Sequence, residues 1–373
     1  MKLMSVFLFL STLALQAEDS AWDQRMADVN KLEREGQFVK AEPLYAAAVV
    51  DAEAFGPKDT RLAQALNNYG AHLFNAGRYK DAEHAYLKAA SIWSVEGGAN
   101  LAAALNNLGA LYRSMAKYTE SEARYLEALQ IQTGLFGKDS IQSATVLNNL
   151  AQLYRMQGRF SEARAYASKS VSVTKANDPK LGDRLLTLGS TCADFGQYEE
   201  AFAFYEKAEQ ALGPNHPRLA SVLNNMAEVY IAQRRYEQAE AYTRRALAIY
   251  ESRVGSEHPN VAIALNNLAQ SLRLQRRYAE AEPLYRRSLQ ILEKRLGAGH
   301  PDYAKELSNL ADFFHERGRE SGAISLYLKS LAVLQETLGP EHPLTTKIRG
   351  NLALVYRAEG RYTEAANLQV SKQ

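Results

Sequence analysis

The feature that most constrains this chain is an internal repeat of about forty residues. An aromatic residue follows a turn of Gly and basic residues at this interval, and Glu320 takes its place in the eighth copy. The aromatic residues are Phe38, Tyr79, Tyr118, Phe160, Tyr198, Tyr236, Tyr278 and Tyr362. A unit of this length cannot bury its apolar surface alone, so neighbouring copies must pack on one another. The repeat therefore predicts a solenoid.

Each copy carries the apolar spacing of two consecutive helices. In the seventh copy, apolar residues recur at i, i+4, i+7 and i+11, on one face of a helix: Val261, Leu265, Leu268 and Leu272. A turn at 275–277 follows, and Tyr278 begins the next apolar stripe. Gly297 is expected to end that helix in the left-handed region. The sequence therefore predicts an all-α chain of about nine helix-turn-helix repeats.

The repeats divide residues 18–373 into nine segments. We expect them at 22–56, 61–97, 99–137, 140–177, 179–213, 216–255, 258–297, 300–339 and 342–373. Five copies carry two adjacent Asn residues in the first helix, such as Asn148-Asn149. The first copy has no such pair, as expected of an end cap. In the fifth copy Thr187 replaces the second Asn, so either the surface formed by these Asn residues divides into two halves there or the solenoid changes its curvature.

Residues 1–17 have the pattern of a secretory signal peptide. Lys2 precedes an apolar run over 3–15, and Ala17 or Ala14 offers a cleavage site. As a helix this run covers roughly 20 Å, less than the ~30 Å of a bilayer core. We therefore expect export to the periplasm or medium, with no stable membrane insertion after cleavage. The alternative is an uncleaved membrane anchor.

Composition and motifs exclude several function classes. The 44 basic and 42 acidic residues give a net charge of +2, which argues against nucleic-acid binding. Cys192 stands alone and is expected to be a small core residue. No catalytic or phosphate-binding motif occurs, so we expect no enzyme activity and no cofactor.

Four His-Pro pairs are the remaining candidates for a metal site. They are His216-Pro217, His258-Pro259, His300-Pro301 and His342-Pro343. Helices pack ~8–10 Å apart, so equivalent His residues in different repeats cannot share one ion, whose ligands lie about 2 Å away. Pro suits the first turn of a helix, and His then lies near the N-cap. A structural role is predicted, with no metal.

The repeat also resembles a known family. Residues 147–154 read Leu-Asn-Asn-Leu-Ala-Gln-Leu-Tyr, residues 360–365 read Gly-Arg-Tyr-Thr-Glu-Ala, and a Leu-Gly-x-x-His-Pro pattern occurs at 296–301. These motifs are similar to the long tetratricopeptide repeats of kinesin light chains and their bacterial relatives. The resemblance implies a right-handed superhelix whose first helices line a concave groove. It does not imply motor cargo binding, since the N-terminus indicates export.

A row of Asn residues is the main candidate for a binding surface. By the resemblance, the second Asn of each pair points into the groove: Asn68, Asn107, Asn149, Asn225, Asn267, Asn309 and Asn351. Their carboxamides could hold the backbone of an extended peptide, because they both donate and accept. Alternatively, each Asn bonds the neighbouring repeat and forms a structural ladder. The first Asn of each pair is expected to serve packing between repeats.

A second row consists of Arg residues one turn further along the first helices. They are Arg113, Arg155, Arg273 and Arg357. Such a row would suit a peptide that carries carboxylates. Alternatively, these cations lie at solvated helix ends, where they complement the helix dipole. A variable position at Gln152, Glu228, Gln270 and Asp312 would set specificity.

Together these patterns predict a non-enzymatic scaffold. We expect it to bind a protein or an extended peptide through an Asn-lined groove. The alternative is a structural protein whose repeats join copies into homo-oligomers.

Overall fold

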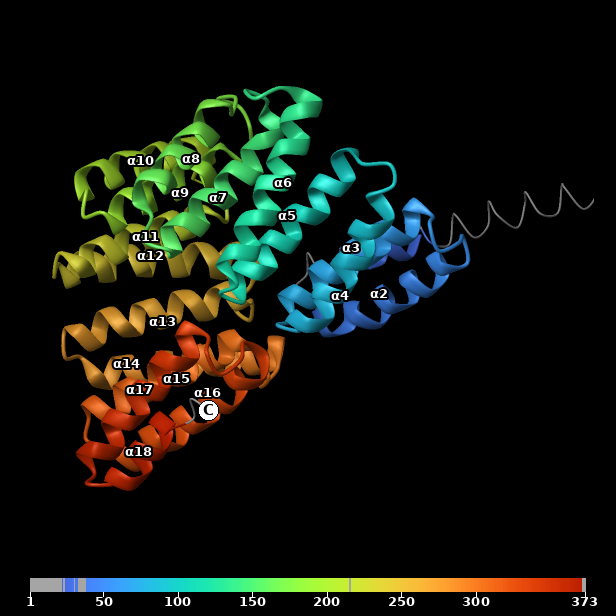
Figure 1. Ribbon diagram of the computed structural model, residues 1–373. Coiled ribbons are helices and arrows are strands. Elements are labelled where there is room, and N and C mark those ends of the chain that lie inside the picture. Colours follow the sequence, from blue (N-terminus) through green and yellow to red (C-terminus); the bar gives the residue numbers. More distant parts are fainter. Residues whose placement is uncertain (1–21, 23, 30, 33–37, 215, 371–373) are drawn as a thin grey trace, which may run out of the picture. The chain divides into compact units, whose positions relative to one another are not determined.

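The computed structural model describes residues 22, 24–29, 31–32, 38–214 and 216–370 (Figure 1). These residues fold into helices and connecting turns, and no strand occurs among them. None of their helices has the length and apolar character needed to span a bilayer. The predicted signal peptide at 1–17 lies outside the described residues.

The chain divides into two compact units, residues 1–108 and 109–373. In the first unit the apolar residues of segment 22–32 pack on α2 and α3; Met26 and Val29 are buried against Tyr45. The division between the units falls within α5. The helices up to that point are α2 (Phe38–Glu53), α3 (Thr60–Asn75), α4 (Tyr79–Trp93) and α5 (Gly98–Ser114).

The second unit continues as consecutive helix pairs (Figure 1). Its helices after α5 are α6 (Tyr118–Phe136), η1 (Ile141–Ser143), α7 (Ala144–Met156), α8 (Phe160–Ser172), α9 (Leu181–Asp194), α10 (Tyr198–Leu212), α11 (Leu219–Ala232), α12 (Tyr236–Val254), α13 (Pro259–Leu274), α14 (Tyr278–Leu296), α15 (Pro301–Glu316), α16 (Glu320–Thr337), α17 (Pro343–Ala358) and α18 (Tyr362–Val370). Each helix packs on its neighbours in the chain, so the core runs through the repeats.

The aromatic landmark marks the first residue of every second helix, from Phe38 in α2 to Tyr362 in α18, and Glu320 does so in α16. Gly residues allow close contact between the two helices of a pair. A Cβ added at Gly189 would lie 2.6 Å from the ring of Tyr205. Only Gly allows this contact, so the pattern of small residues positions α9 against α10.

The turn between the helices of a pair requires a left-handed residue. Gly158 has φ of 70° in the fourth repeat, whereas Arg234 and Arg276 have φ of 60° and 61°. The expectation for Gly297 was wrong in detail. Helix α14 does end at Leu296, but Gly297 has φ of 90° and ψ of 158°. These angles belong to an extended region reserved for Gly and not to a left-handed cap.

Three of the four His-Pro pairs cap helices, as predicted, whereas His216-Pro217 lies ahead of α11, whose N-cap is Arg218. His258 and His300 are N-caps whose Nδ1 atoms accept the backbone N–H groups of Asn260 and Asp302 at 3.1 and 3.0 Å. The following Pro occupies the first turn, where it loses no helical hydrogen bond. Burial, and then the charge of Arg295, lower the pKa of His258, which keeps its ring neutral and able to accept.

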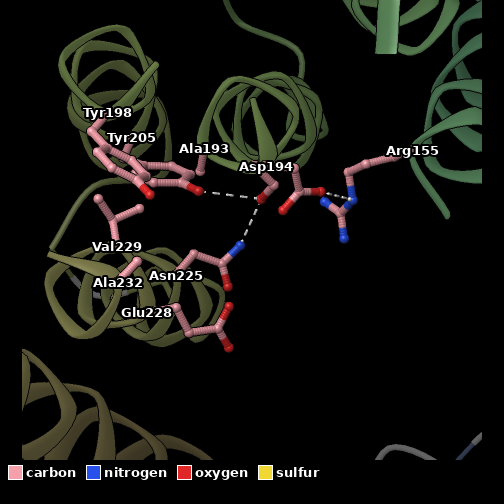
Figure 2. Close-up of a pocket in the computed structure, with 10 residues that line it drawn as sticks. Arg155, Ala193, Asp194, Tyr198, Tyr205, Asn225, Glu228, Val229 and Ala232 are labelled. Atoms are coloured by element: carbon pink, nitrogen blue, oxygen red, sulfur yellow. Dashed lines mark hydrogen bonds and ion pairs between the residues drawn. The ribbon is translucent and has the colours of Figure 1, made fainter. Parts of the chain in front are cut away.

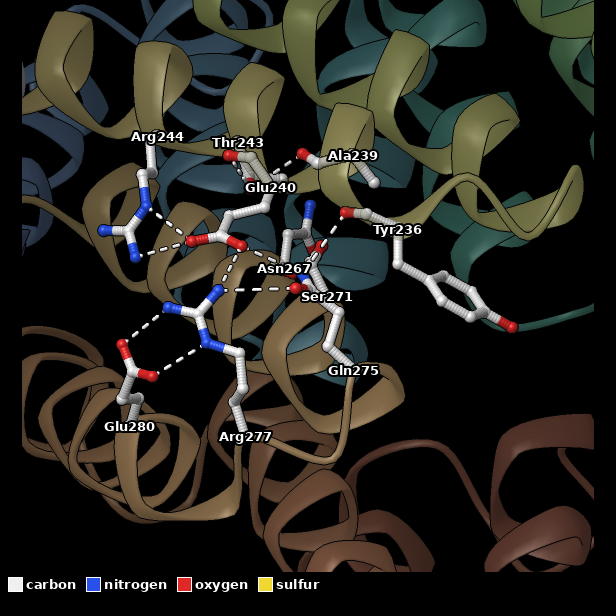
Figure 3. Close-up of polar contacts among 10 residues, drawn as sticks. All are labelled: Tyr236, Ala239, Glu240, Thr243, Arg244, Asn267, Ser271, Gln275, Arg277 and Glu280. Carbon is white, nitrogen blue, oxygen red and sulfur yellow. Dashed lines mark hydrogen bonds and ion pairs between the residues drawn. The ribbon is translucent and has the colours of Figure 1, made fainter.

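Arginines in the turns tie second helices together across repeats. Arg277 Nη1 donates to Glu240 Oε2 in the preceding second helix at 2.6 Å, and its other nitrogens pair with Glu280 (Figure 3). Gln275 and Arg244 also donate to Glu240 at 2.9 Å. The same clamp recurs between Arg159 and Glu122 at 3.0 Å and between Arg319 and Glu282 at 2.9 Å. These clamps are not predicted by the repeat pattern of the sequence.

Candidate functional site

Three adjoining hollows lie on the first helices α7, α9, α11 and α13. We call them the α7–α9 pocket, the α9–α11 pocket and the α11–α13 pocket, and their volumes are about 330, 320 and 460 Å³. The first and third pockets share Arg218, and the second and third share Asn225 and Glu228. The hollows therefore form one surface along four repeats.

The α7–α9 pocket is lined by Asn148, Asn149 and Thr187 together with basic residues. Arg184 is only 4% exposed, and its Nη1 donates to Thr174 and lies 3.9 Å from Asp178. Burial lowers the pKa of Arg184, and the charge of Asp178 opposes this shift.

Ser190 lines the α9–α11 pocket and accepts two hydrogen bonds there. Asn225 Nδ2 donates to Ser190 Oγ at 2.8 Å, and the Tyr205 hydroxyl donates to the same oxygen at 3.4 Å (Figure 2). Arg155 forms an ion pair of 3.1 Å with Asp194 across the pocket. Burial raises the pKa of Tyr205 to about 12, so the phenol stays protonated and donates.

Glu228 differs from the other polar residues of this pocket. Figure 2 shows no interaction that joins its carboxylate to the residues drawn, and no hydrogen bond or ion pair to it occurs among the described residues. Its side chain reaches solvent, yet the surrounding protein desolvates it. This desolvation raises the pKa of Glu228, while the charges of Lys305 and Arg155 lower it and that of Asp194 raises it.

The α11–α13 pocket is lined mainly by amides and hydroxyls. Ser221 and Tyr250 share a hydrogen bond of 2.8 Å at one wall. Asn224 is 5% exposed, and its Oδ1 has no hydrogen-bond partner in the part of the chain that is described. Asn260, Ile263 and Asn267 of α13 also line the pocket.

Three of the seven predicted Asn residues, Asn149, Asn225 and Asn267, line these hollows. All seven side chains are half-buried. In the first unit, Asn68 accepts from Gln64 of its own helix at 2.9 Å and Asn107 donates to Asn67 at 3.0 Å.

A structural ladder, one of the two roles considered for the Asn row, is present at four positions. In each case the second Asn donates to the preceding first helix. The bonds are Asn107 to Asn67 at 3.0 Å, Asn225 to Ser190 at 2.8 Å, Asn309 to Asn266 at 3.1 Å and Asn351 to Asp312 at 3.2 Å. Asn67 and Asn266 are the first Asn of their helices. Ser190 and Asp312 lie four positions after the residue that takes the place of the first Asn, so all four acceptors lie on the same helix face.

The fifth repeat continues this ladder with hydroxyl groups. Gln152 Nε2 donates to Thr187 Oγ1 at 3.4 Å, and Ser190 accepts from Asn225 on the other side. Helix α9 thus bonds to both neighbouring first helices without an Asn pair.

The Arg row is held by the repeat that follows. Arg113 donates to Gln152, Arg155 pairs with Asp194, and Arg273 pairs with Glu316. Neither role considered for these residues anticipated this arrangement. Arg357 of the same row is exposed.

The lone cysteine lies in the core, away from solvent. Cys192 is 1% exposed, and burial raises the pKa of its thiol, which confirms its place in the core. Across the described ranges, no three His, Cys, Asp or Glu side chains form a group that could hold a metal ion. What the surface offers is a row of hydrogen-bonding groups on a preformed framework.

Helix pairs that recur about every forty residues and pack on their chain neighbours define an α-helical repeat protein. The family of tetratricopeptide repeat proteins matches residues 100–176, 183–252, 218–294, 260–332 and 302–369, and this chain belongs to that family. Such repeats indicate a scaffold for protein interactions. No curated protein gives a significant match.

Several solved structures are similar to this chain. The crystal structure of BtubC (BKLC) from P. vanneervenii is 19% identical, covers 60% of this chain and 87% of its own, and has a TM-score of 0.46. Two crystal structures of kinesin light chain nearly identical TPR-like repeats from Podosopora anserina are 20% identical. They cover 51% of this chain and 93% and 94% of their own, with TM-scores of 0.42 and 0.41.

Proposed function

We propose that this chain is a non-catalytic scaffold that binds an extended peptide along the first helices α7, α9, α11 and α13. The observation that carries the proposal is the set of three adjoining hollows, each lined by an Asn of the predicted row. An extended peptide exposes N–H and C=O groups at regular intervals, and carboxamides can pair with both.

The rigid framework lowers the entropy cost of peptide binding. The helices are fixed by their own core and by the Asn ladder, so the surface does not have to order itself when a peptide binds. Hydrogen bonds to the peptide backbone supply affinity, and the variable position that includes Gln152 and Glu228 would select among side chains.

The test is replacement of both Asn149 and Asn267 by Ala. Partners captured from the exported fraction by the purified chain should be lost, while helicity and its thermal melt change little. Asn367→Ala, on the exposed face of α18, is the matched control and should retain capture. Capture that persists in the double variant would refute the Asn-lined surface as the binding site.

The place of action is a separate proposal. The sequence of residues 1–17 supports export with cleavage after Ala17 or Ala14. Mass spectrometry of the chain recovered from the exported fraction should show the shortened form. A full-length chain in the membrane fraction would instead support the uncleaved anchor.

Homo-oligomeric assembly is the second candidate function. Two apolar residues of the last helix pair, Leu354 and Tyr362, are 58% and 70% exposed, and such residues could form a contact between copies. Sedimentation of the mature chain tests this directly. A monomer at all concentrations would exclude assembly. A dimer that the substitution Leu354→Ser dissociates would support it.

A further inference from the structure

We propose that the α11–α13 pocket binds a Lys or Arg side chain of the peptide. This inference rests on the proposed function and specifies the class of peptide: one with a basic residue that reaches Asn224 and Glu228. One of the two roles considered for the Arg row was to bind a peptide that carries carboxylates. The α11–α13 pocket indicates a basic residue instead.

Asn224 provides the first argument. Its side chain lines the pocket and is 5% exposed, yet its Oδ1 accepts no hydrogen bond from any described residue. A buried acceptor without a donor costs free energy, so such atoms usually have a partner in the functional state. A bound ligand can supply the missing donor, and Lys and Arg carry donors without acceptors.

Glu228 provides the second argument. It lies one helical turn after Asn224 on α11, so both side chains project to the same face. Its carboxylate lines the same pocket and has no ion-pair partner in the described ranges. A cation between these two groups would satisfy the amide oxygen and the carboxylate together.

The positive charges near the pocket are already balanced or remote from this carboxylate. Arg218, the basic residue of the lining, lies 3.6 Å from Asp183, and Arg155 is paired with Asp194. Lys305 acts on Glu228 only as a charge, without a direct contact. None of these residues therefore supplies the donor that Asn224 and Glu228 lack.

The apolar part of the pocket also fits a basic side chain. Ile263 of α13 lines the pocket with 45% of its surface exposed. The aliphatic stem of Lys or Arg can pack on such a residue while its charged end reaches polar groups. At about 460 Å³, the pocket lies within the usual range for ligand sites.

The experiment selects binders from a random dodecapeptide display library on the purified chain, and then measures the affinity of the selected peptides. We expect Lys or Arg at one fixed position of the selected peptides. Glu228→Gln should weaken binding about tenfold, as should replacement of the peptide Arg by citrulline, which keeps the shape and removes the charge. Glu237→Gln, an exposed residue of α12 outside the pocket, removes the same charge and should leave affinity unchanged.

The outcomes separate this inference from the proposed function. Selected peptides that need Asn149 and Asn267 but contain no fixed basic residue, and are indifferent to Glu228→Gln, would overturn the inference alone. Selection of no peptide would overturn both. If spermidine competes with the selected peptides only when Glu228 is intact, a cation binds in the pocket. If spermidine binds there while no peptide does, a free polyamine is the ligand and the peptide proposal is wrong.

Discussion

Asn225 Nδ2 lies 2.8 Å from Ser190 Oγ, and the two residues are 35 positions apart on consecutive first helices. Tyr205 donates to the same oxygen from the second helix α10. One hydroxyl therefore joins three helices of two repeats. All three residues line the α9–α11 pocket.

Ser190→Ala should destabilise the chain by about 1–2 kcal/mol, because two buried donors lose their shared acceptor. Urea unfolding followed by helicity measures the change. Ser161→Ala, at an exposed position of α8, is the control and should have little effect. Equal midpoints for the two variants would show that the hydroxyl ladder contributes nothing to stability.

Gly189 and Gly350 should respond to the same substitution with opposite signs. Gly189→Ala places a methyl group 2.6 Å from the Tyr205 ring, which should cost about 1–3 kcal/mol as α9 and α10 separate. Gly350 lies in α17 with no atom within 4 Å of the added Cβ, so Gly350→Ala should stabilise by up to about 1 kcal/mol. The two urea midpoints check both signs, and a shift in the same direction would contradict the packing argument.

The clamp between Arg277 and Glu240 should stabilise the contact between their repeats more than an ordinary surface ion pair does. Burial raises the pKa of Glu240, but hydrogen bonds from Gln275 and Arg244 and the charges of Arg244 and Arg277 outweigh it, so the pKa lies below its usual value. A double-mutant cycle with Arg277→Met and Glu240→Gln measures the coupling.

The control for this cycle is the exposed pair of Arg124 and Glu127, which lies within α6. Its coupling should be smaller, since it joins neighbouring turns of one helix and is open to solvent. Added salt should weaken both couplings. If the two pairs coupled equally, the link between repeats would have no special role in stability.

The sequence predicted the fold because its signals are local and repeated. The aromatic landmark places the start of each second helix, and the apolar spacing of Leu265 and Leu268 identifies the buried face of α13. Both depend only on helical geometry and on turn residues a few positions away. The nine-repeat organisation follows from them.

The details of the surface could not be predicted in the same way. The pairing of Arg155 with Asp194 depends on the rotation of α9 against α7, which spacing within one repeat does not specify. Ser190 gave no signal, since the fifth repeat departs from the Asn pattern. Within the described part of the chain, Glu228 has no ion-pair partner because of the residues that the fold places around it. The sequence indicated only that it belongs to the variable position that would set specificity.

Glu306 should make stability depend on pH in the direction opposite to most carboxylates. It is 6% exposed in α15, and burial raises its pKa to about 7, although Asn309 donates to it at 3.2 Å and Lys305 is near. Its folded state therefore binds a proton more tightly than the unfolded state, whose value is near 4.5. The stability that Glu306 contributes is fully present below pH 4.5 and is lost as the pH rises through about 7.

This loss amounts to about 3 kcal/mol, since each step of one in pKa corresponds to about 1.4 kcal/mol. Glu306→Gln removes the ionisation. The free energy of unfolding of the variant, measured with urea, should therefore rise relative to that of the wild type between pH 5 and pH 8. Glu336→Gln, exposed on α16, removes the same charge and should follow the wild type at every pH. Parallel curves for the wild type and Glu306→Gln would mean that the buried carboxyl group ionises without cost, and that its burial against Asn309 does not raise its pKa.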